Sequence, residues 1–171
     1  MKLIGSARAA REQEYLEFAA ARTPQLYRSA CLLASGDTHL AEDLVQETLG
    51  RMYAHWGRRI DNPAAYAHTV LVRVFLTHQR RRSNGERPTG ELPDSAQREG
   101  DPALRLTLLQ ALGRLSARDR AVLVLRYWED RSIEETADAL RASSGAVRTQ
   151  SSRALGRLRA VLGDSLADLP R

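Results

Sequence analysis

The apolar pattern of this chain stops near its middle, and this gap constrains the fold more than any other feature of the sequence. Between Ser83 and Gly100 the helical repeat of apolar residues is absent. Turn-forming residues take its place, namely Asn84, Gly85, Pro88, Gly90 and Pro93. Polar stretches of this length are uncommon inside one compact domain. The sequence therefore predicts two modules joined by a flexible linker.

Helices are predicted on both sides of the gap. Apolar residues recur at three- and four-residue steps in segments such as 40–56, which is the spacing of a helix with one buried face. Asn62 and Asp101 each precede a proline, and Ser132 stands three residues before Glu135. Both patterns predict helix starts. Aromatic residues make up only 5% of the chain, which argues against a β-sandwich built on aromatic strands.

These patterns predict an all-α fold of two small helical domains. The first clear periodic segment begins at Leu26. We expect an N-terminal tail, a first domain, a linker, a second domain and a C-terminal tail, with bounds 1–9, 10–82, 83–101, 102–165 and 166–171.

The charge balance indicates a polyanionic partner. Lys plus Arg number 26 against 21 Asp plus Glu, and every basic residue except Lys2 is an arginine. Arginine supplies planar, forked donors that suit phosphates and guanine edges. A single cysteine permits no internal disulfide, and neither an apolar run of membrane-spanning length nor a basic-then-apolar leader is visible. We therefore expect a cytoplasmic protein that has no contact with a membrane.

Metal, cofactor and catalytic chemistry find no support in the sequence. The histidines and Cys31 lack the spacing of metal-ligand pairs, and no glycine-rich phosphate loop or nucleophile elbow occurs. We expect no enzyme activity, no metal and no cofactor. Cys31, Trp56 and Trp128 fall on apolar faces, so we expect them in the core.

The segment 132–159 has the pattern of a helix-turn-helix. A short helix through Leu140 is followed by a tight turn at 141–145 and a second helix in which Val147, Leu155 and Leu158 point inward. No acidic residue occurs between Asp138 and Asp164. The outward face can enter a major groove, with candidate contacts at Arg141, Ser144, Arg148, Thr149, Ser152, Arg153 and Arg157. A solvated basic helix is the alternative.

Two further polar groups lie in the first half of the chain. Asp43, Gln46, Glu47 and Arg51 are spaced to share one helix face, which can meet a partner surface or simply be solvated. Basic residues then gather around the next predicted helix, where they can meet phosphates or an extruded base; they are Arg58, Arg59, Arg73, Arg80, Arg81 and Arg82, with Asn62 among them as an N-cap.

The second half of the chain resembles region 4 of sigma-70 family RNA polymerase sigma factors of the extracytoplasmic-function (ECF) group. The resemblance rests on the run from Ser132 to Ala137, on the turn and helix start at 143–148, and on the lead-in at 115–128. Region 4 alone also resembles the DNA-binding domain of response regulators. The run from Asp43 to Thr48 is similar to the family's region 2 motif, and the two modules stand in the family's order. The arginine-rich composition favours actinobacterial, SigE-like relatives.

The resemblance implies that the chain binds the bacterial RNA polymerase core and promoter DNA. The acidic group Asp43, Gln46, Glu47 and Arg51 would meet the β′ clamp helices, and the β flap and an anti-sigma factor are further expected partners. The basic group from Arg58 to Arg82 would bind the −10 element, and the face of the helix-turn-helix would bind the −35 element. The alternatives are a helix-turn-helix regulator that acts without core polymerase, and a sigma-like module that only sequesters a partner.

Overall fold

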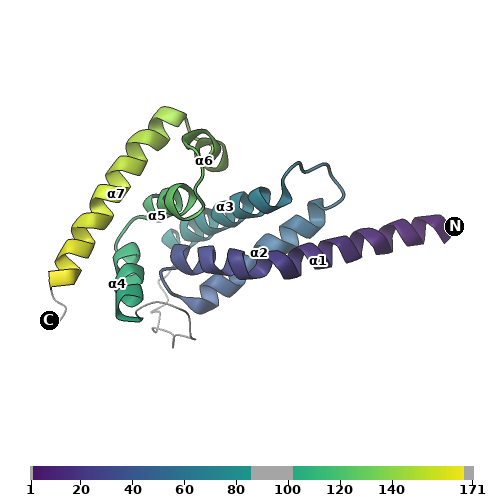
Figure 1. Cartoon of the computed structure of the whole chain (residues 1–171), viewed down its shortest axis with the longest axis horizontal. Coiled ribbons are helices and arrows are strands. Elements are labelled where there is room, and N and C mark those ends of the chain that lie inside the picture. The colour runs from purple at the N-terminus through teal and green to yellow at the C-terminus, as the bar shows by residue number, and fades with distance from the viewer. Residues whose placement is uncertain (1, 86–101, 168–171) are drawn as a thin grey trace.

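The computed structural model describes residues 2–85 and 102–167, and the regular elements within these ranges are all helices (Figure 1). This confirms the all-α prediction. The first three helices are α1 (Lys2–Leu33), α2 (Thr38–His55) and α3 (Pro63–Ser83). The remaining elements are α4 (Pro102–Gly113), α5 (Ala117–Leu123), a π-helical turn η1 (Val124–Trp128), α6 (Ile133–Leu140) and α7 (Ser144–Ala167).

Local capping residues set the helix starts. The Asn62 side chain accepts a hydrogen bond from the backbone N–H of Ala65, with Pro63 at the first helical position. Ser132 and Glu135 form the reciprocal capping box that their spacing predicts. These caps satisfy backbone donors that a helix cannot pair internally. The predicted starts of α3 and α6 are therefore confirmed.

The turn between α1 and α2 holds two successive residues in the left-handed backbone region. Ser35 has φ 55° and Gly36 has φ 89°. Glycine adopts this conformation without a steric penalty, whereas the Cβ of a serine is strained in it. Asp37 then caps α2 by accepting a hydrogen bond from the N–H of Leu40.

Helix α1 begins far earlier than the apolar repeat from Leu26 suggests. Its preceding turns are anchored by aromatic contacts on α2: Tyr15 packs edge-on against Trp56 at 5.4 Å between ring centroids, and Phe18 lies 4.7 Å from the same ring. The hydroxyl of Tyr15 donates a 2.7 Å hydrogen bond to the carbonyl of Leu49. The part of α1 before Leu26 is therefore held by separate aromatic contacts of Tyr15 and Phe18, and its helical packing does not require a continuous apolar repeat.

The two halves of the chain share one hydrophobic core. Leu26, Leu44 and Phe75 from the first three helices belong to the same buried cluster as Val122 and Leu125 from the second half. In Figure 1, α5 and α6 lie beside α3, and contacts between these helices agree with the view. Most of the predicted linker, residues 86–101, lies outside the described residues, as does the predicted cap Asp101. The domain bounds stay predictions.

Four predicted core positions differ from expectation, and the first is Trp56, which is only half-buried against the main core cluster. Trp128 is 54% exposed because it lies at the end of η1, where the chain leaves the core. Leu155 and Leu158 are half-buried, since they pack at the edge of a small cluster with Leu112 and Leu115. Cys31 is buried, as predicted.

The described residues hold neither a membrane-spanning helix nor a cluster of metal ligands. None of the described helices is long and apolar enough to cross a bilayer. No group of His, Cys, Asp and Glu side chains in the described part of the chain is arranged to hold a metal ion.

Candidate functional site

The acidic group of α2 forms one exposed face. Asp43, Gln46, Glu47 and Arg51 are all exposed, while Leu44 on the opposite side is buried in the core. Arg51 and Glu47 pair across one helical turn at 2.5 Å, and both side chains keep 44% of their surface accessible. A pair this exposed adds little stability. The face is therefore available to a partner.

The loop between α2 and α3 presents two arginines to solvent. Arg58 and Arg59 are exposed, and Arg59 lies 3.8 Å from Asp61, with both of these side chains more than 90% accessible. Asn62 has a structural role as the cap of α3. The loop thus offers positive charge and the N-terminus of a helix to an anion.

A cavity of about 260 Å³ opens next to this loop. Its lining comprises Arg11, Glu14, Trp56, Gly57, Arg58, Ile60 and Pro63. The guanidinium of Arg11 lies over Gly57, where a Cβ would approach its Nη1 to 2.7 Å. Arg11 was not expected at this site, because it belongs to the part of α1 that carries no apolar repeat. The cavity combines an indole with three charged side chains, and it is smaller than the ~300 Å³ typical of drug-sized ligand sites.

The basic residues of α3 fall into two groups. Arg80 and Arg81 are exposed near the helix end, and Arg82 is half-buried. Arg73 differs, because its guanidinium donates hydrogen bonds to the carbonyls of Ala139 at 2.9 Å and Asp138 at 3.0 Å. Burial, aided by the charge of Arg141, lowers the pKa of Arg73. One arginine expected to contact DNA therefore contacts the helix-turn-helix instead.

The helix-turn-helix has the predicted local geometry. Helix α6 ends at Leu140, and Arg141 takes a left-handed backbone with φ 52°. The Ser143 hydroxyl then accepts a 3.1 Å hydrogen bond from the N–H of Ala146, which caps α7. Val147 is 1% exposed and holds the second helix against the first. The turn is tight without a glycine at its left-handed position.

The outward face of α7 carries most of the predicted contacts. Arg148, Thr149, Ser152 and Arg153 are exposed, and Ser144 at the helix start is half-buried. Arg141 also points to solvent from the turn. Arginine, threonine and serine side chains on one helix face can donate to base edges and phosphates.

Two residues of α7 turn toward α5 instead. Arg157 lies 2.5 Å from the buried carboxylate of Asp119, and the Gln150 amide donates to the same carboxylate at 3.3 Å. Gln150 also accepts a hydrogen bond from Arg118 at 3.2 Å. These contacts fix the orientation of α7 on its own module.

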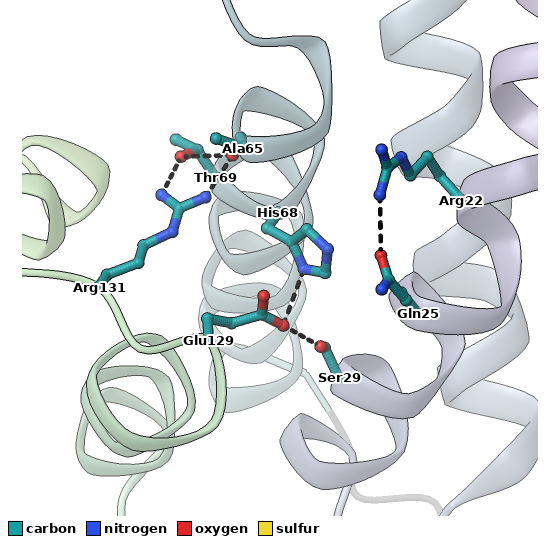
Figure 2. A network of polar contacts seen from close by, with 8 residues as sticks. All are labelled: Arg22, Gln25, Ser29, Ala65, His68, Thr69, Glu129 and Arg131. Carbon is teal, nitrogen blue, oxygen red and sulfur yellow. Dashed lines mark hydrogen bonds and ion pairs between the residues drawn. The ribbon is translucent and has the colours of Figure 1, made fainter.

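A further polar network joins the two halves of the chain, and no pattern in the sequence predicts it. Glu129 accepts a hydrogen bond from Ser29 and lies 2.9 Å from Nδ1 of His68, as Figure 2 shows. Arg131 donates to the hydroxyl of Thr69 at 2.8 Å and to the carbonyl of Ala65. Single polar residues so far apart in sequence form no pattern, so only the packed structure brings them together.

The Glu129 carboxylate is stabilised in its charged form. Burial alone would raise the pKa of Glu129, but the hydrogen bonds from His68 and Ser29 and the charge of Arg131 outweigh burial and lower it. Burial in turn lowers the pKa of Arg131, against the opposing effect of Glu129. The network therefore contains two opposite charges, Glu129 and Arg131, which are each partly removed from water and bind different groups of the first module.

An exposed acidic helix face on one helical module and a basic helix-turn-helix on the next are features of a DNA-binding transcription protein. Residues 19–85 match the family model of Sigma-70 region 2, and residues 111–160 match that of Sigma-70, region 4. The chain belongs to the sigma-70 family, as an ECF sigma factor with regions 2 and 4. It directs promoter recognition by RNA polymerase, and the family is not catalytic.

Individual relatives agree with this assignment. The RNA polymerase sigma-E factor of Streptomyces avermitilis is 38% identical over 156 residues, which cover 87% of this chain and 85% of the relative. The sigma-E factor of Streptomyces antibioticus is 40% identical over 129 residues, covering 71% and 70%. The sigma factor RpoE from Bartonella quintana, solved with the anti-sigma factor NepR, superposes with a TM-score of 0.73 at 26% identity, covering 88% of this chain and 98% of that one.

Proposed function

We propose that the exposed face of α2 binds the β′ clamp helices of RNA polymerase, through Asp43, Gln46, Glu47 and Arg51. The observation that carries this assignment is the segregation of α2: the four polar side chains are exposed together while Leu44 and Met52 are buried. Core residues of the helix therefore hold the face rigid without taking part in it. Charged anchors in such a position commonly dominate an interface.

The first domain, residues 10–82, holds the −10 element in this proposal. Arg58, Arg59 and Asn62 lie beside the cavity that contains Trp56, where an extruded base can stack and meet hydrogen-bonding side chains. The positive surface continues along the last turn of α3, through Arg80, Arg81 and Arg82. These side chains would bind the phosphate backbone of the single DNA strand of the −10 element. Arg73 joins these DNA-binding arginines when its hydrogen bonds to Asp138 and Ala139 of the helix-turn-helix are broken.

The second domain, residues 102–165, reads the −35 element through α7. Arg148 and Thr149 stand near the helix start, where side chains reach base edges, and Ser152 and Arg153 follow one turn later. Arg141 and Ser144 flank the helix start and suit phosphates. Arg157 contributes charge at the edge, although its guanidinium is held by Asp119. Residues 83–101 act as the linker between the domains, and 1–9 and 166–171 as tails.

An apolar groove on the second domain suits the β flap. Its lining comprises Leu108, Leu112, Leu123, Val124, Tyr127, Trp128, Leu155 and Leu158, together with Leu32 of α1. Tyr127 and Trp128 are each more than half exposed, which is unusual for large apolar side chains without a partner. The complex of RpoE with the anti-sigma factor NepR also favours an anti-sigma factor as a partner of this chain. A cytoplasmic location follows from these partners.

Reconstitution tests this function directly. The purified chain is mixed with core RNA polymerase, and the complex is isolated by gel filtration and assayed for transcription from a library of promoters. We expect co-elution and initiation that depends on both elements. A helix-turn-helix regulator that acts without polymerase would instead bind duplex DNA tightly by itself and fail to co-elute.

A further inference from the structure

We propose that helix α1 helps to read the −10 element, and that its side chains Arg11 and Glu14 select cytosine over thymine as the extruded base. Both residues line the cavity next to the loop between α2 and α3, although the end of α1 and all of α2 separate them from that loop in the sequence. The inference rests on the proposed binding of an extruded base in this cavity. It names the residues that choose the base.

The two side chains continue the face of α1 that packs against α2. Arg11 lies one helical turn before Tyr15. Glu14 lies one turn before Phe18, so all four positions share one side of the helix. Tyr15 and Phe18 contact the ring of Trp56, and helix α1 runs beside α2 in Figure 1. Arg11 and Glu14 therefore extend this face from the indole onto the loop.

Helix α1 is fixed on α2 without the help of a ligand. Tyr15 is buried, and its hydroxyl donates a 2.7 Å hydrogen bond to the carbonyl of Leu49. Its ring also packs edge-on against the ring of Tyr53, at 4.9 Å between centroids. The wall that α1 adds to the cavity is therefore in place before DNA arrives. A preformed wall loses little conformational freedom when a base binds.

The position of Arg11 depends on a glycine in the loop. A Cβ at Gly57 would approach Nη1 of Arg11 to 2.7 Å and its Cζ to 3.1 Å. The absence of a side chain at Gly57 thus leaves the space that the guanidinium occupies. Among the described residues, neither Arg11 nor Glu14 has a hydrogen-bond or ion-pair partner. The polar atoms of both side chains are therefore available to a base.

The donors and acceptors around the cavity fit the edge of cytosine. An ionised carboxylate only accepts hydrogen bonds, whereas a guanidinium only donates them. Glu14 therefore supplies acceptors, and Arg11 and Arg58 supply donors. The pairing edge of cytosine presents one amino donor, N4, beside two acceptors, N3 and O2. Trp56 offers an aromatic face on which the base can stack.

Thymine fails this match at one atom. It carries the acceptor O4 where cytosine carries the N4 amino group, so Glu14 would place two acceptors against each other. A mismatched base contact of this kind lowers binding about tenfold. Glu14→Gln keeps the shape of the side chain, and its amide both accepts and donates. The variant should therefore accommodate either pyrimidine.

The test of Glu14 uses holoenzyme reconstituted from core polymerase and the full-length chain, on a barcoded promoter library randomised through the −10 element. Wild type is compared with Glu14→Gln and with the control Glu12→Gln, which makes the same change at an exposed position of α1 outside the cavity. In wild type and control, we expect one position at which initiation favours cytosine over thymine about tenfold. Glu14→Gln should lose this preference and keep those at the other positions.

Arg11 and Gly57 are tested as a pair on a promoter with the preferred cytosine. Gly57→Ala should displace the guanidinium and lower initiation as much as Arg11→Ala does, about tenfold. The double variant should be no weaker than either single variant, because both remove the same contact. Arg8→Ala, at an exposed position of α1 outside the cavity, is the control and should have no effect. Effects that multiply in the double variant contradict the proposed placement of Arg11.

A cytosine preference that survives in Glu14→Gln overturns the proposal, as does the lack of such a preference in wild type. Arg58→Ala separates this failure from failure of the proposed function. If Arg58→Ala loses recognition of the −10 element while Glu14→Gln changes nothing, only the selection by α1 is wrong. If neither variant alters use of the −10 element, the cavity does not hold its extruded base, and the proposed function of this site fails as well.

Discussion

The guanidinium of Arg157 on α7 lies 2.5 Å from the carboxylate of Asp119 on α5, and the two side chains differ sharply in exposure, at 57% and 4%. The buried member of the pair also accepts a hydrogen bond from Gln150. The carboxylate of Asp119 thus holds two residues of α7, Arg157 and Gln150, against α5. The orientation of α7 on its own module therefore depends on Asp119, a buried residue that lies outside the proposed DNA-binding face.

Removing this carboxylate should destabilise the second domain. In Asp119→Ala, Arg157 and Gln150 lose their shared acceptor, and we expect a loss of about 1–3 kcal/mol in the free energy of unfolding. Urea denaturation followed by circular dichroism measures the change. Glu134→Ala, which removes an exposed carboxylate of the same module, should cost less than about 0.5 kcal/mol. Equal losses in the two variants would show that Asp119 has no special structural role.

The acidic face of α2 should control polymerase binding. Asp43→Ala with Glu47→Ala leaves the buried side of the helix intact, so helicity is retained while affinity for core polymerase falls about tenfold or more. Fluorescence anisotropy of the labelled chain with core polymerase measures the affinity. The control Glu12→Ala with Glu134→Ala removes the same charge from exposed positions elsewhere. If the control weakens binding equally, net charge and not this face is responsible.

Arg148 and Arg153 should divide the work of the recognition helix. Arg148→Ala removes a side chain near the helix start and should cost about 1–3 kcal/mol while relaxing preference at one −35 position. Arg153→Ala should weaken binding to all sequences alike and reduce the salt slope by about one unit. Transcription by reconstituted holoenzyme on a library of −35 variants, at several salt concentrations, separates the two. No shift in base preference for Arg148→Ala would contradict this assignment.

Trp128 should matter for polymerase binding more than for stability. A buried tryptophan replaced by alanine costs about 3–5 kcal/mol, but Trp128 is 54% exposed and should cost much less. We expect Trp128→Ala to weaken the polymerase complex about tenfold, because exposed aromatic anchors are frequent hot spots. Leu16→Ala, at a 53% exposed position on α1, serves as the control. A large fall in melting temperature without weaker binding would place Trp128 in the core after all.

The polar network around Glu129 makes stability depend on pH in one direction. The pKa of Glu129 is lowered in the folded chain, so its contribution is complete above the ordinary glutamate pKa of about 4.3 and is lost as the pH falls through the lowered folded value. The difference in unfolding free energy between wild type and Glu129→Gln should therefore shrink as the pH falls below about 4.3, where the folded carboxylate takes up a proton. Denaturation series at several pH values test this. A difference that stays constant into acid would mean that the carboxylate charge contributes nothing.

Helix identity and capping could be predicted from the sequence because they depend on neighbours in the chain. Asn62 and Ser132 both cap the helices that their spacing indicates. The exposed face of α2 followed from periodicity for the same reason. The start of α1 could not be predicted from periodicity, because Tyr15 is held by residues more than thirty positions away.

The packing of one module on the other was not predictable from local patterns. A polar gap in the sequence indicates a linker, but it says nothing about whether the segments on either side touch. Arg73 illustrates the limit: its position in a basic helix predicts a DNA contact, whereas its bonds to Asp138 and Ala139 arise only from tertiary packing. Arg11 likewise lines the cavity beside Trp56 because of tertiary packing, which no local pattern in the sequence indicates.

The left-handed backbone of Ser35 places two demands on one residue. A non-glycine residue in this conformation costs about 1–2 kcal/mol, yet its hydroxyl accepts a hydrogen bond from Arg120 of the other module. A glycine at this position would relieve the strain and favour the isolated first domain, while removing a contact that ties the two domains together. At Ser35, the change that would stabilise the first domain by itself would also weaken its contact with the second domain.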